Sequence, residues 1–225
     1  MTIKWHQYTD GSGEGEQRDS GGGDGPGPPP GPAGYGAAEF TCDSVAGDAR
    51  PTPSGPSSAR RPVTEPPTFP MGQLTTAGPE ALATQTGRLT WACAGTVVDE
   101  SDQPGYIGAR AHTNNTGELS GLWYALERAE RRAPGCGREV IHTDSLYALN
   151  MTTGKWMPRT KGRRNAAMVA DMRRKWRRVQ RLRPGEVALR HVRSHIKVPG
   201  NELADWLADQ GAAGATMTLE RARCG

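Results

Sequence analysis

Four acidic residues occupy positions from which carboxylates could bind a metal ion: Asp10, Glu118, Asp144 and Asp205. Asp10 ends a short β-prone run, and Asp144 directly follows the short apolar run VIHT. Ligand sites of open α/β sheets collect at the carboxyl ends of strands. Because like charges at short range oppose joint ionisation, four carboxylates share a site only with a cation. Oxygen-only ligation favours Mg²⁺ or Mn²⁺.

Each of these acids also has a plainer explanation. An Asp that ends a strand is often a turn former or a helix N-cap. Glu118, which is expected to open a helix, would be favoured there by the helix dipole. Asp205 can be a solvated helix residue, as we assume for its neighbour Asp209. Taken singly, none of the four acids establishes a site.

Positive charge is concentrated in one segment of the chain. Residues 155–183 contain twelve Lys or Arg and a single acid, Asp171, in a protein of net charge +4. Such a stripe is typical of a polyanion-binding surface, although most charge runs are simply solvated helix faces. The density of the charge and the interleaved Trp156 and Trp176 favour nucleic acid.

Composition divides the chain into folding and non-folding parts. Of 30 Gly and 18 Pro, 16 and 13 lie between residues 11 and 87. Segments so poor in apolar residues do not bury enough surface to fold. We therefore expect a single domain over residues 1–213, with a flexible loop at about 13–31 and a disordered insertion at about 44–87. Residues 214–225 are expected to be a C-terminal tail.

No apolar run approaches the ~20 residues of a membrane span. The N-terminus, MTIKWHQYTDG, also lacks the apolar region of a signal peptide. We therefore expect a protein without membrane contact, located inside the cell in the cytoplasm or the nucleus.

Hydrophobic periodicity distributes these residues over alternating strands and helices. Strands are expected at residues 3–9, 35–42, 89–98, 106–111, 139–143 and 186–192. Helices are expected at residues 118–133, 145–151, 166–182 and 199–212. The order predicts a mixed α/β sheet, an antiparallel meander followed by parallel strands, with helices on both faces.

Four blocks of sequence, taken in order, resemble the type 1 ribonuclease H family. They are YTDGS at 8–12, TNNTGEL at 113–119, TDS at 143–145 and HxxxxGNELAD at 195–205. GPAGYGA at 31–37 is similar to the entry of that family's second strand. The resemblance covers about 1–12, 31–43 and 89–213, and it implies the ribonuclease H-like fold with a five-stranded mixed sheet.

The resemblance implies an endonuclease that hydrolyses the RNA strand of RNA–DNA hybrids and leaves 5′-phosphomonoester products. By position, Asp10, Glu118, Asp144 and Asp205 would ligate two Mg²⁺ ions, with Mn²⁺ as a substitute. One ion would activate the attacking water and the other would stabilise the leaving 3′ oxygen. His195 matches the family's mobile histidine, which would shuttle a proton or help product release. The alternative for His195 is an ordinary surface histidine.

The same resemblance implies residues that hold the hybrid. Asn114 and Asn115 match family residues that reach base edges and sugar hydroxyls, and 2′-OH contacts distinguish RNA from DNA. Asn201 corresponds to a residue near the edge of the active site, and it is also a natural helix cap. Trp156 would lie against the sugar–phosphate of the DNA strand. The basic residues expected to bind the backbone are Lys155, Arg163, Arg164, Arg173, Arg174 and Lys175.

Two other functions stay open at the level of sequence. A non-catalytic hybrid-binding module, or a retroelement remnant, would be expected to lose one of the four acids, and all four are present. A resolvase or integrase of the same broad fold is disfavoured by the TNNTGEL block and the basic segment. We expect the RNA–DNA hybrid as the partner of a monomer, and the sequence indicates no protein partner.

Overall fold

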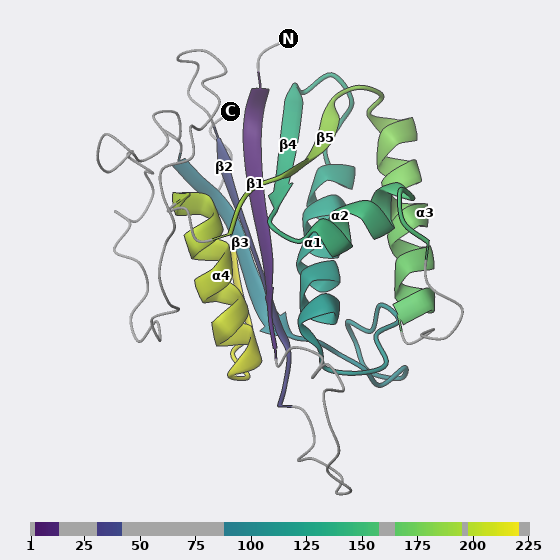
Figure 1. Cartoon of the computed structure of the whole chain (residues 1–225). Coiled ribbons are helices and arrows are strands. Elements are labelled where there is room, and N and C mark those ends of the chain that lie inside the picture. Colours follow the sequence, from purple (N-terminus) through teal and green to yellow (C-terminus); the bar gives the residue numbers. More distant parts are fainter. Residues whose placement is uncertain (1–2, 14–30, 42–87, 158–164, 195–197, 221–225) are drawn as a thin grey trace, which may run out of the picture.

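The computed structural model describes residues 3–13, 31–41, 88–157, 165–194 and 198–220, which share one mixed sheet (Figure 1). The expected loop and insertion lie almost wholly outside these residues. The strands are β1 (Ile3–Ser12), β2 (Gly34–Thr41), β3 (Arg88–Thr96), β4 (Arg138–Thr143), β5 (Val187–His191) and β6 (Met217–Glu220). The helices are α1 (Asn114–Glu130), α2 (Leu146–Thr153), α3 (Ala166–Leu182) and α4 (Pro199–Ala212).

The strand order β5-β4-β1-β2-β3-β6 places β1 and β4 side by side in the sheet. Strands β1, β2 and β3 form an antiparallel meander, whereas β4 runs parallel to β1 and β5 parallel to β4. Thr9 pairs in register with Thr143. Parallel strands end at the same edge of a sheet, so the residues that follow this pair, Asp10 and Asp144, become neighbours.

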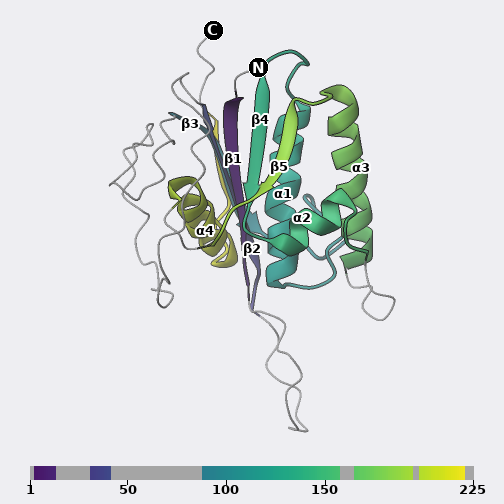
Figure 2. The same cartoon turned by 45° about the horizontal axis from the view of Figure 1, so that its top comes forward.

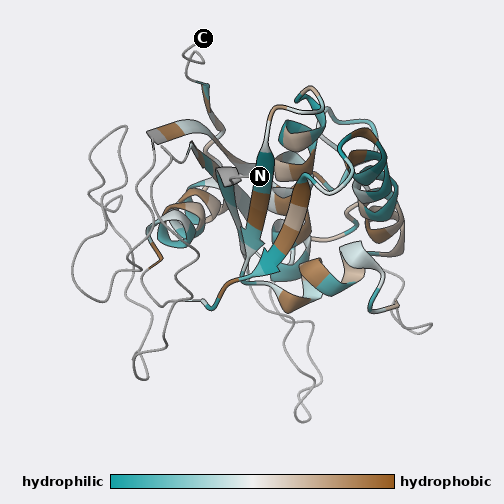
Figure 3. Cartoon of the chain, turned by 90° about the horizontal axis from the view of Figure 1, so that it is seen from above, coloured by the Kyte–Doolittle hydropathy of each residue, from teal (hydrophilic) through white to brown (hydrophobic). Residues whose placement is uncertain are grey.

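The helices cover both faces of the sheet, as the pattern of elements predicts. Helices α1, α2 and α3 lie on one side and α4 on the other (Figures 1 and 2). Leu119, Leu122 and Leu126 of α1 are fully buried in one core, and Tyr8 and Leu207 belong to a second core under α4. In Figure 3 the outermost helix, α3, is mostly hydrophilic. None of the described helices is long and apolar enough to cross a membrane.

The sheet has six strands rather than the expected five. Residues 217–220, expected to lie in a tail, form β6 and pair antiparallel with β3, with Trp91 opposite Glu220. Met217 and Leu219 pack against the core under α4. A strand of four residues is too short for periodicity to indicate it, and tertiary packing therefore decides its conformation.

The expected strand at residues 106–111 is wrong. Gly105 and Gly108 have φ angles of 91° and 96°, which interrupt an extended conformation. A Cβ atom on Gly108 would lie 2.8 Å from the backbone nitrogen of Met168. Ala109 is fully buried in the core beside α1. The segment is therefore a loop that packs against the start of α3.

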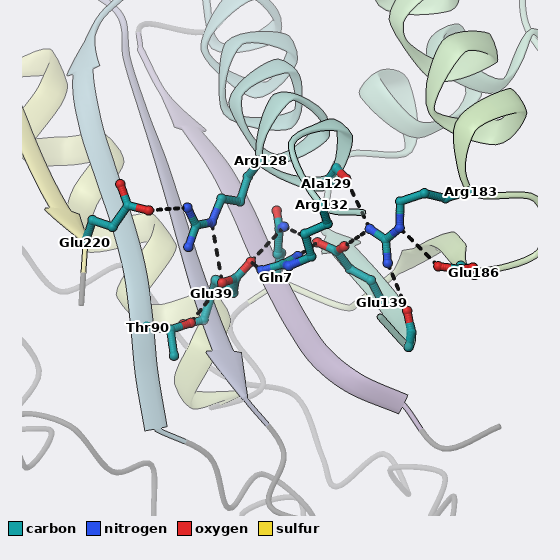
Figure 4. A network of polar contacts seen from close by, with 11 residues as sticks. Gln7, Glu39, Thr90, Arg128, Ala129, Arg132, Glu139, Arg183, Glu186 and Glu220 are labelled. Carbon is teal, nitrogen blue, oxygen red and sulfur yellow. Dashed lines mark hydrogen bonds and ion pairs between the residues drawn. The ribbon is translucent and has the colours of Figure 1, made fainter. Parts of the chain in front are cut away.

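A buried network of ion pairs joins the C-terminal end of α1 to β2 and β4, and Arg128 also pairs with Glu220 of β6 at 2.6 Å (Figure 4). Glu39 of β2 pairs with both Arg128 and Arg132. Glu139 of β4 pairs at 2.6 Å with Arg132 and with Arg183. Both glutamates and the two arginines that bind Glu139 are at most 3% exposed. Because α1 also carries Glu118, this network fixes the helix that brings Glu118 to the sheet.

Candidate active site

Asp10 stands near the end of β1, opposite Gly36 of β2, and is 5% exposed. Its Oδ1 accepts a 2.7 Å hydrogen bond from the backbone N–H of Gly11. A Cβ atom on Gly11 would lie only 2.1 Å from the backbone nitrogen of Glu118. The glycine therefore lets the backbone of α1 approach β1 closely enough to bring Glu118 beside Asp10.

Helix α1 begins at Asn114, four residues before the expected start at Glu118. Thr113 and Thr116 cap it reciprocally: the Thr113 hydroxyl accepts from the Thr116 N–H, and the Thr116 hydroxyl accepts from the Thr113 N–H. Glu118 therefore lies in the second turn, beyond the first turn where a carboxylate complements the helix dipole best. It is 5% exposed, and Nδ2 of Asn114 donates to its Oε1 at 3.4 Å.

Asp144 follows the last residue of β4 but does not cap the next helix. Ser145 caps α2, because its hydroxyl accepts from the N–H of Ala148 at 3.1 Å. The side chain of Asp144 is instead bound by Asn201 of α4, whose Nδ2 donates to Oδ2 at 3.2 Å. The ring Nε2 of His191 lies 3.1 Å from the backbone oxygen of Asp144. His191 was not predicted from the sequence; it reaches Asp144 because it ends β5, where it pairs with Thr143 of β4.

Asp10, Glu118 and Asp144 form one carboxylate cluster, in which one oxygen from each lies within 4.8 Å of the others. Burial raises the pKa of Asp10 and of Glu118 well above their ordinary values, and the neighbouring carboxylates raise both pKa values further. Glu118 Oε2 and Asp144 Oδ1 are buried and have no hydrogen-bond partner among the described residues. Converging carboxylate oxygens from three residues, two of which also carry an unpartnered oxygen, fit a hard divalent cation.

The fourth acid, Asp205 of α4, does not belong to this three-residue cluster. Its charge nevertheless raises the pKa of Asp10 and of Glu118, which places it near both. One turn further along α4, Asp209 accepts a 2.5 Å hydrogen bond from the hydroxyl of Ser12 and also raises the pKa of Asp10. The assumption that Asp209 is a solvated helix residue is therefore wrong, because α4 packs against β1 at this point.

The asparagines expected to touch the hybrid lie at the same edge of the sheet as the cluster. Asn114 and Asn115 are half-buried in the first turn of α1, four and three residues before Glu118. Asn201 is 2% exposed and its Nδ2 donates to Asp144, while its Oδ1 has no hydrogen-bond partner in the part of the chain that the structure describes.

The expected backbone-binding residues divide into two kinds. Lys155 and Trp156 are exposed just after α2, and Arg174 is exposed on α3 with an ion pair to Asp171 at 2.7 Å. In contrast, Lys175 lies 3.9 Å above the ring of Trp123 and pairs with a glutamate of α1. Arg173 donates to the backbone oxygens of residues 151 and 156. His195, Arg163 and Arg164 lie outside the described residues.

The sequence of this chain matches a known family. The profile described as RNase H matches residues 82–213, which include Glu118, Asp144 and Asp205 but not β1 and β2. Ribonuclease H of Bordetella avium is 38% identical over 107 residues, which cover 45% of this chain and 65% of that protein. Ribonuclease H of Parvibaculum lavamentivorans is 37% identical over 110 residues, which cover 47% and 70%. The chain thus spans about two thirds of these relatives.

Similar solved structures include RNase H1 of Halobacterium salinarum, with 20% identity, a TM-score of 0.47 and coverage of 93% of this chain and 97% of that one. LC11-RNase H1, solved in complex with an RNA/DNA hybrid, has 14% identity, a TM-score of 0.42 and coverage of 92% and 98%. Because these structures share 20% identity or less with this chain, its family is shown by the sequence match, which covers more than half of the chain. This chain belongs to the ribonuclease H family of enzymes.

Proposed function

We propose that this protein is a metal-dependent endonuclease that hydrolyses the RNA strand of RNA–DNA hybrids and leaves 5′-phosphomonoester ends. The observation that carries the proposal is the cluster of Asp10, Glu118 and Asp144, with oxygens within 4.8 Å of one another. The match to the RNase H family also supports the proposal. So does the positive charge of α3, which lies on the same side of the sheet as α2 and beyond it (Figure 1).

The three clustered carboxylates, with Asp205 beside them, would hold the metal. Two Mg²⁺ ions, or Mn²⁺ in their place, would activate the attacking water and stabilise the leaving 3′ oxygen. Glu118 Oε2 and Asp144 Oδ1, which have no partner among the described residues, are atoms that a cation would satisfy. Asn201 holds the Asp144 carboxylate in one orientation, as an outer-shell partner of a metal ligand does.

The chain's own groups also control protons at this site. Because burial and mutual repulsion raise the pKa values of Asp10 and Glu118, these carboxyls retain protons to higher pH than exposed acids do. Cation binding displaces those protons, so metal affinity falls as pH falls. His195 would move a proton at the leaving group or assist product release.

Recognition of the hybrid would be divided between two surfaces. Asn114 and Asn115 lie beside the carboxylates and would contact the RNA strand, where the 2′-OH groups distinguish RNA from DNA. The exposed residues after α2 and on α3 would contact the phosphates of the DNA strand. Of these, Arg177 is exposed and makes no ion pair with the described residues, which leaves its charge available for a phosphate.

Substrate class and products test the proposal. The full chain is incubated in Mg²⁺ with end-labelled RNA–DNA, RNA–RNA and DNA–DNA duplexes of one sequence, and the product ends are mapped. Cleavage of the RNA strand of the hybrid alone, with 5′-phosphate ends, is expected. Tight hybrid binding without cleavage would instead identify the non-catalytic binding module. Cutting of DNA duplexes would indicate a resolvase or integrase activity.

A further inference from the structure

The turn after α2 fixes the backbone of an exposed aromatic residue. Gly154 caps the C-terminus of α2, and its φ of 82° turns the chain back. The N–H of Trp156 then donates to the backbone oxygen of Asn150 at 3.1 Å. The side chains of Trp156 and Met157 are nevertheless 46% and 69% exposed. A tethered backbone beneath exposed large apolar side chains indicates a contact surface.

A single side chain of α3 holds this turn. Nε of Arg173 donates to the backbone oxygen of Met151 at 2.8 Å, and Nη2 donates to the backbone oxygen of Trp156. Nη1 lies 3.4 Å from the sulfur of Met157. The Met151 oxygen belongs to the last turn of α2, where carbonyls lack partners within the helix. The guanidinium thus ties the end of α2 and the turn to α3.

The geometry of these contacts suits arginine alone. A guanidinium presents its donors as a rigid planar fork, whereas the ammonium of lysine is a compact point charge. Two of its five N–H groups bond to carbonyls and Nη1 lies against the Met157 sulfur, so the guanidinium of Arg173 is held against the turn. Arg177, one turn further along the same helix, is exposed and makes no ion pair with the described residues. The two arginines carry equal charge in different settings.

We infer that Arg173 is a positioning residue: it fixes the turn at residues 154–157 so that the exposed ring of Trp156 meets the hybrid. Its contribution to binding passes through Trp156 and not through its own charge. The inference rests on the proposed function for its ligand. The part of the inference that concerns the protein alone, namely that Arg173 tethers the turn, does not depend on any nucleic acid.

A double-mutant cycle tests the coupling between these residues. Binding of a labelled hybrid is measured by fluorescence anisotropy in an Asp10→Asn background, which prevents cleavage. Arg173→Ala and Trp156→Ala are each expected to raise Kd by about 3- to 10-fold, and the double variant no more than Trp156→Ala alone. Arg173→Lys keeps the charge and is expected not to restore binding. Arg177→Ala is the matched control: when it is combined with Trp156→Ala, the fold-increases in Kd of the two single variants are expected to multiply.

Hydrogen exchange of the free protein gives a readout without nucleic acid. Arg173→Ala is expected to speed exchange of the Trp156 amide, which bonds to Asn150, and Arg177→Ala is expected not to. Unchanged exchange in Arg173→Ala, additive binding effects of Arg173 and Trp156, or rescue by Arg173→Lys would overturn the inference. If the Asp10→Asn protein bound no hybrid at all, the proposed function itself would fail, and the exchange result would still report on the turn.

Discussion

The carboxyl group of Asp10 is almost fully withdrawn from solvent and faces the charges of Asp144, Asp205 and Asp209. Its pKa is therefore raised, first by burial and then by these neighbours. An acid with a raised pKa in the folded state binds protons that the unfolded chain has already released. Without a cation, this group consequently destabilises the fold as pH rises above its ordinary pKa near 3.8.

Asp10→Asn removes this repulsion together with one metal ligand. In EDTA, the variant is expected to melt higher than the wild type, and the difference is expected to grow as pH rises from about 4 towards neutrality. Its hybrid cleavage in Mg²⁺ is expected to fall by about a hundredfold or more. Thermal melts across this pH range, with Asp102→Asn as an exposed control, measure the first effect. Equal melting of the variant and the wild type at all pH values would refute the repulsion.

At the scale of elements, the orientation of α1 depends on buried charge at its C-terminal end. Arg132 is 3% exposed and pairs with Glu39 and Glu139, whereas its neighbour Arg131 is 67% exposed and pairs with Glu127. Removing one partner of a buried pair leaves an uncompensated charge, which is far more costly than the loss of a surface pair. The two adjacent arginines therefore form a matched test.

Arg132→Met is expected to lower the free energy of unfolding by about 3–5 kcal/mol, and Arg131→Met by at most about 1 kcal/mol. Methionine keeps most of the apolar stem in both variants, so the difference reports on charge. Urea unfolding monitored by circular dichroism measures both values. Similar values for the two variants would show that the network does not anchor α1.

The exposed arginines of α3 are expected to govern affinity for the hybrid and not the chemical step. Replacing Arg174, Arg177 and Arg178 by Gln should raise KM and leave kcat at saturating hybrid nearly unchanged, because uniform binding is lost. Each phosphate contact removed should flatten the salt dependence of binding by about 0.9 in the log–log slope. Steady-state kinetics between about 50 and 300 mM salt measure both quantities. A large fall in kcat with unchanged KM would contradict this role.

The end of β2 and the start of β3, which flank the long intervening segment, lie next to each other in the sheet. Thr41 pairs with Arg88 across the two strands, so the ends of the intervening segment are neighbours. The sequence between them is rich in Pro and Thr and poor in large apolar residues. A short turn can therefore close the hairpin, since the entropy of loop closure changes only slowly with length.

Deleting residues 45–85 is accordingly expected to leave both the fold and hybrid cleavage in place. The thermal melting temperature and the specific activity of the shortened chain, compared with the full chain, measure the outcome. Collapse of the shortened protein would mean that the segment is structural and that the single-domain organisation expected from composition is wrong.

The sequence predicted those parts of the fold in which local pattern and tertiary environment agree. The buried stripe of α1 follows from the spacing of Leu119, Leu122 and Leu126. Buried charges such as Glu39 and Arg132 were unpredictable, because the composition of a strand or helix end does not reveal partners 93 residues apart. Gly105 and Gly108 could have excluded the strand at 106–111, since glycines mark turns.

The proximity of Asp10 and Asp144 could be predicted from the sequence, but the surroundings of the candidate site could not. Asp10 and Asp144 come together because β1 and β4 are adjacent and parallel, as strands near a ligand site in a mixed sheet are expected to be. The contacts of Asn201 with Asp144 and of Asp209 with Ser12 depend on how α4 crosses β1. No spacing within the sequence specifies that crossing, so these partners required the structure.

The catalytic role of the carboxylate cluster is tested most directly by the rate of RNA-strand cleavage in a hybrid, measured for the wild type and for Asp144→Asn in Mg²⁺ and in EDTA. Asp144 is chosen because it contributes to the carboxylate cluster and is less buried than Asp10 or Glu118, so the substitution disturbs the fold least. Cleavage is expected only by the wild type and only with Mg²⁺, while both proteins are expected to bind the hybrid. Equal cleavage by the two proteins, or cleavage in EDTA, would contradict this catalytic role.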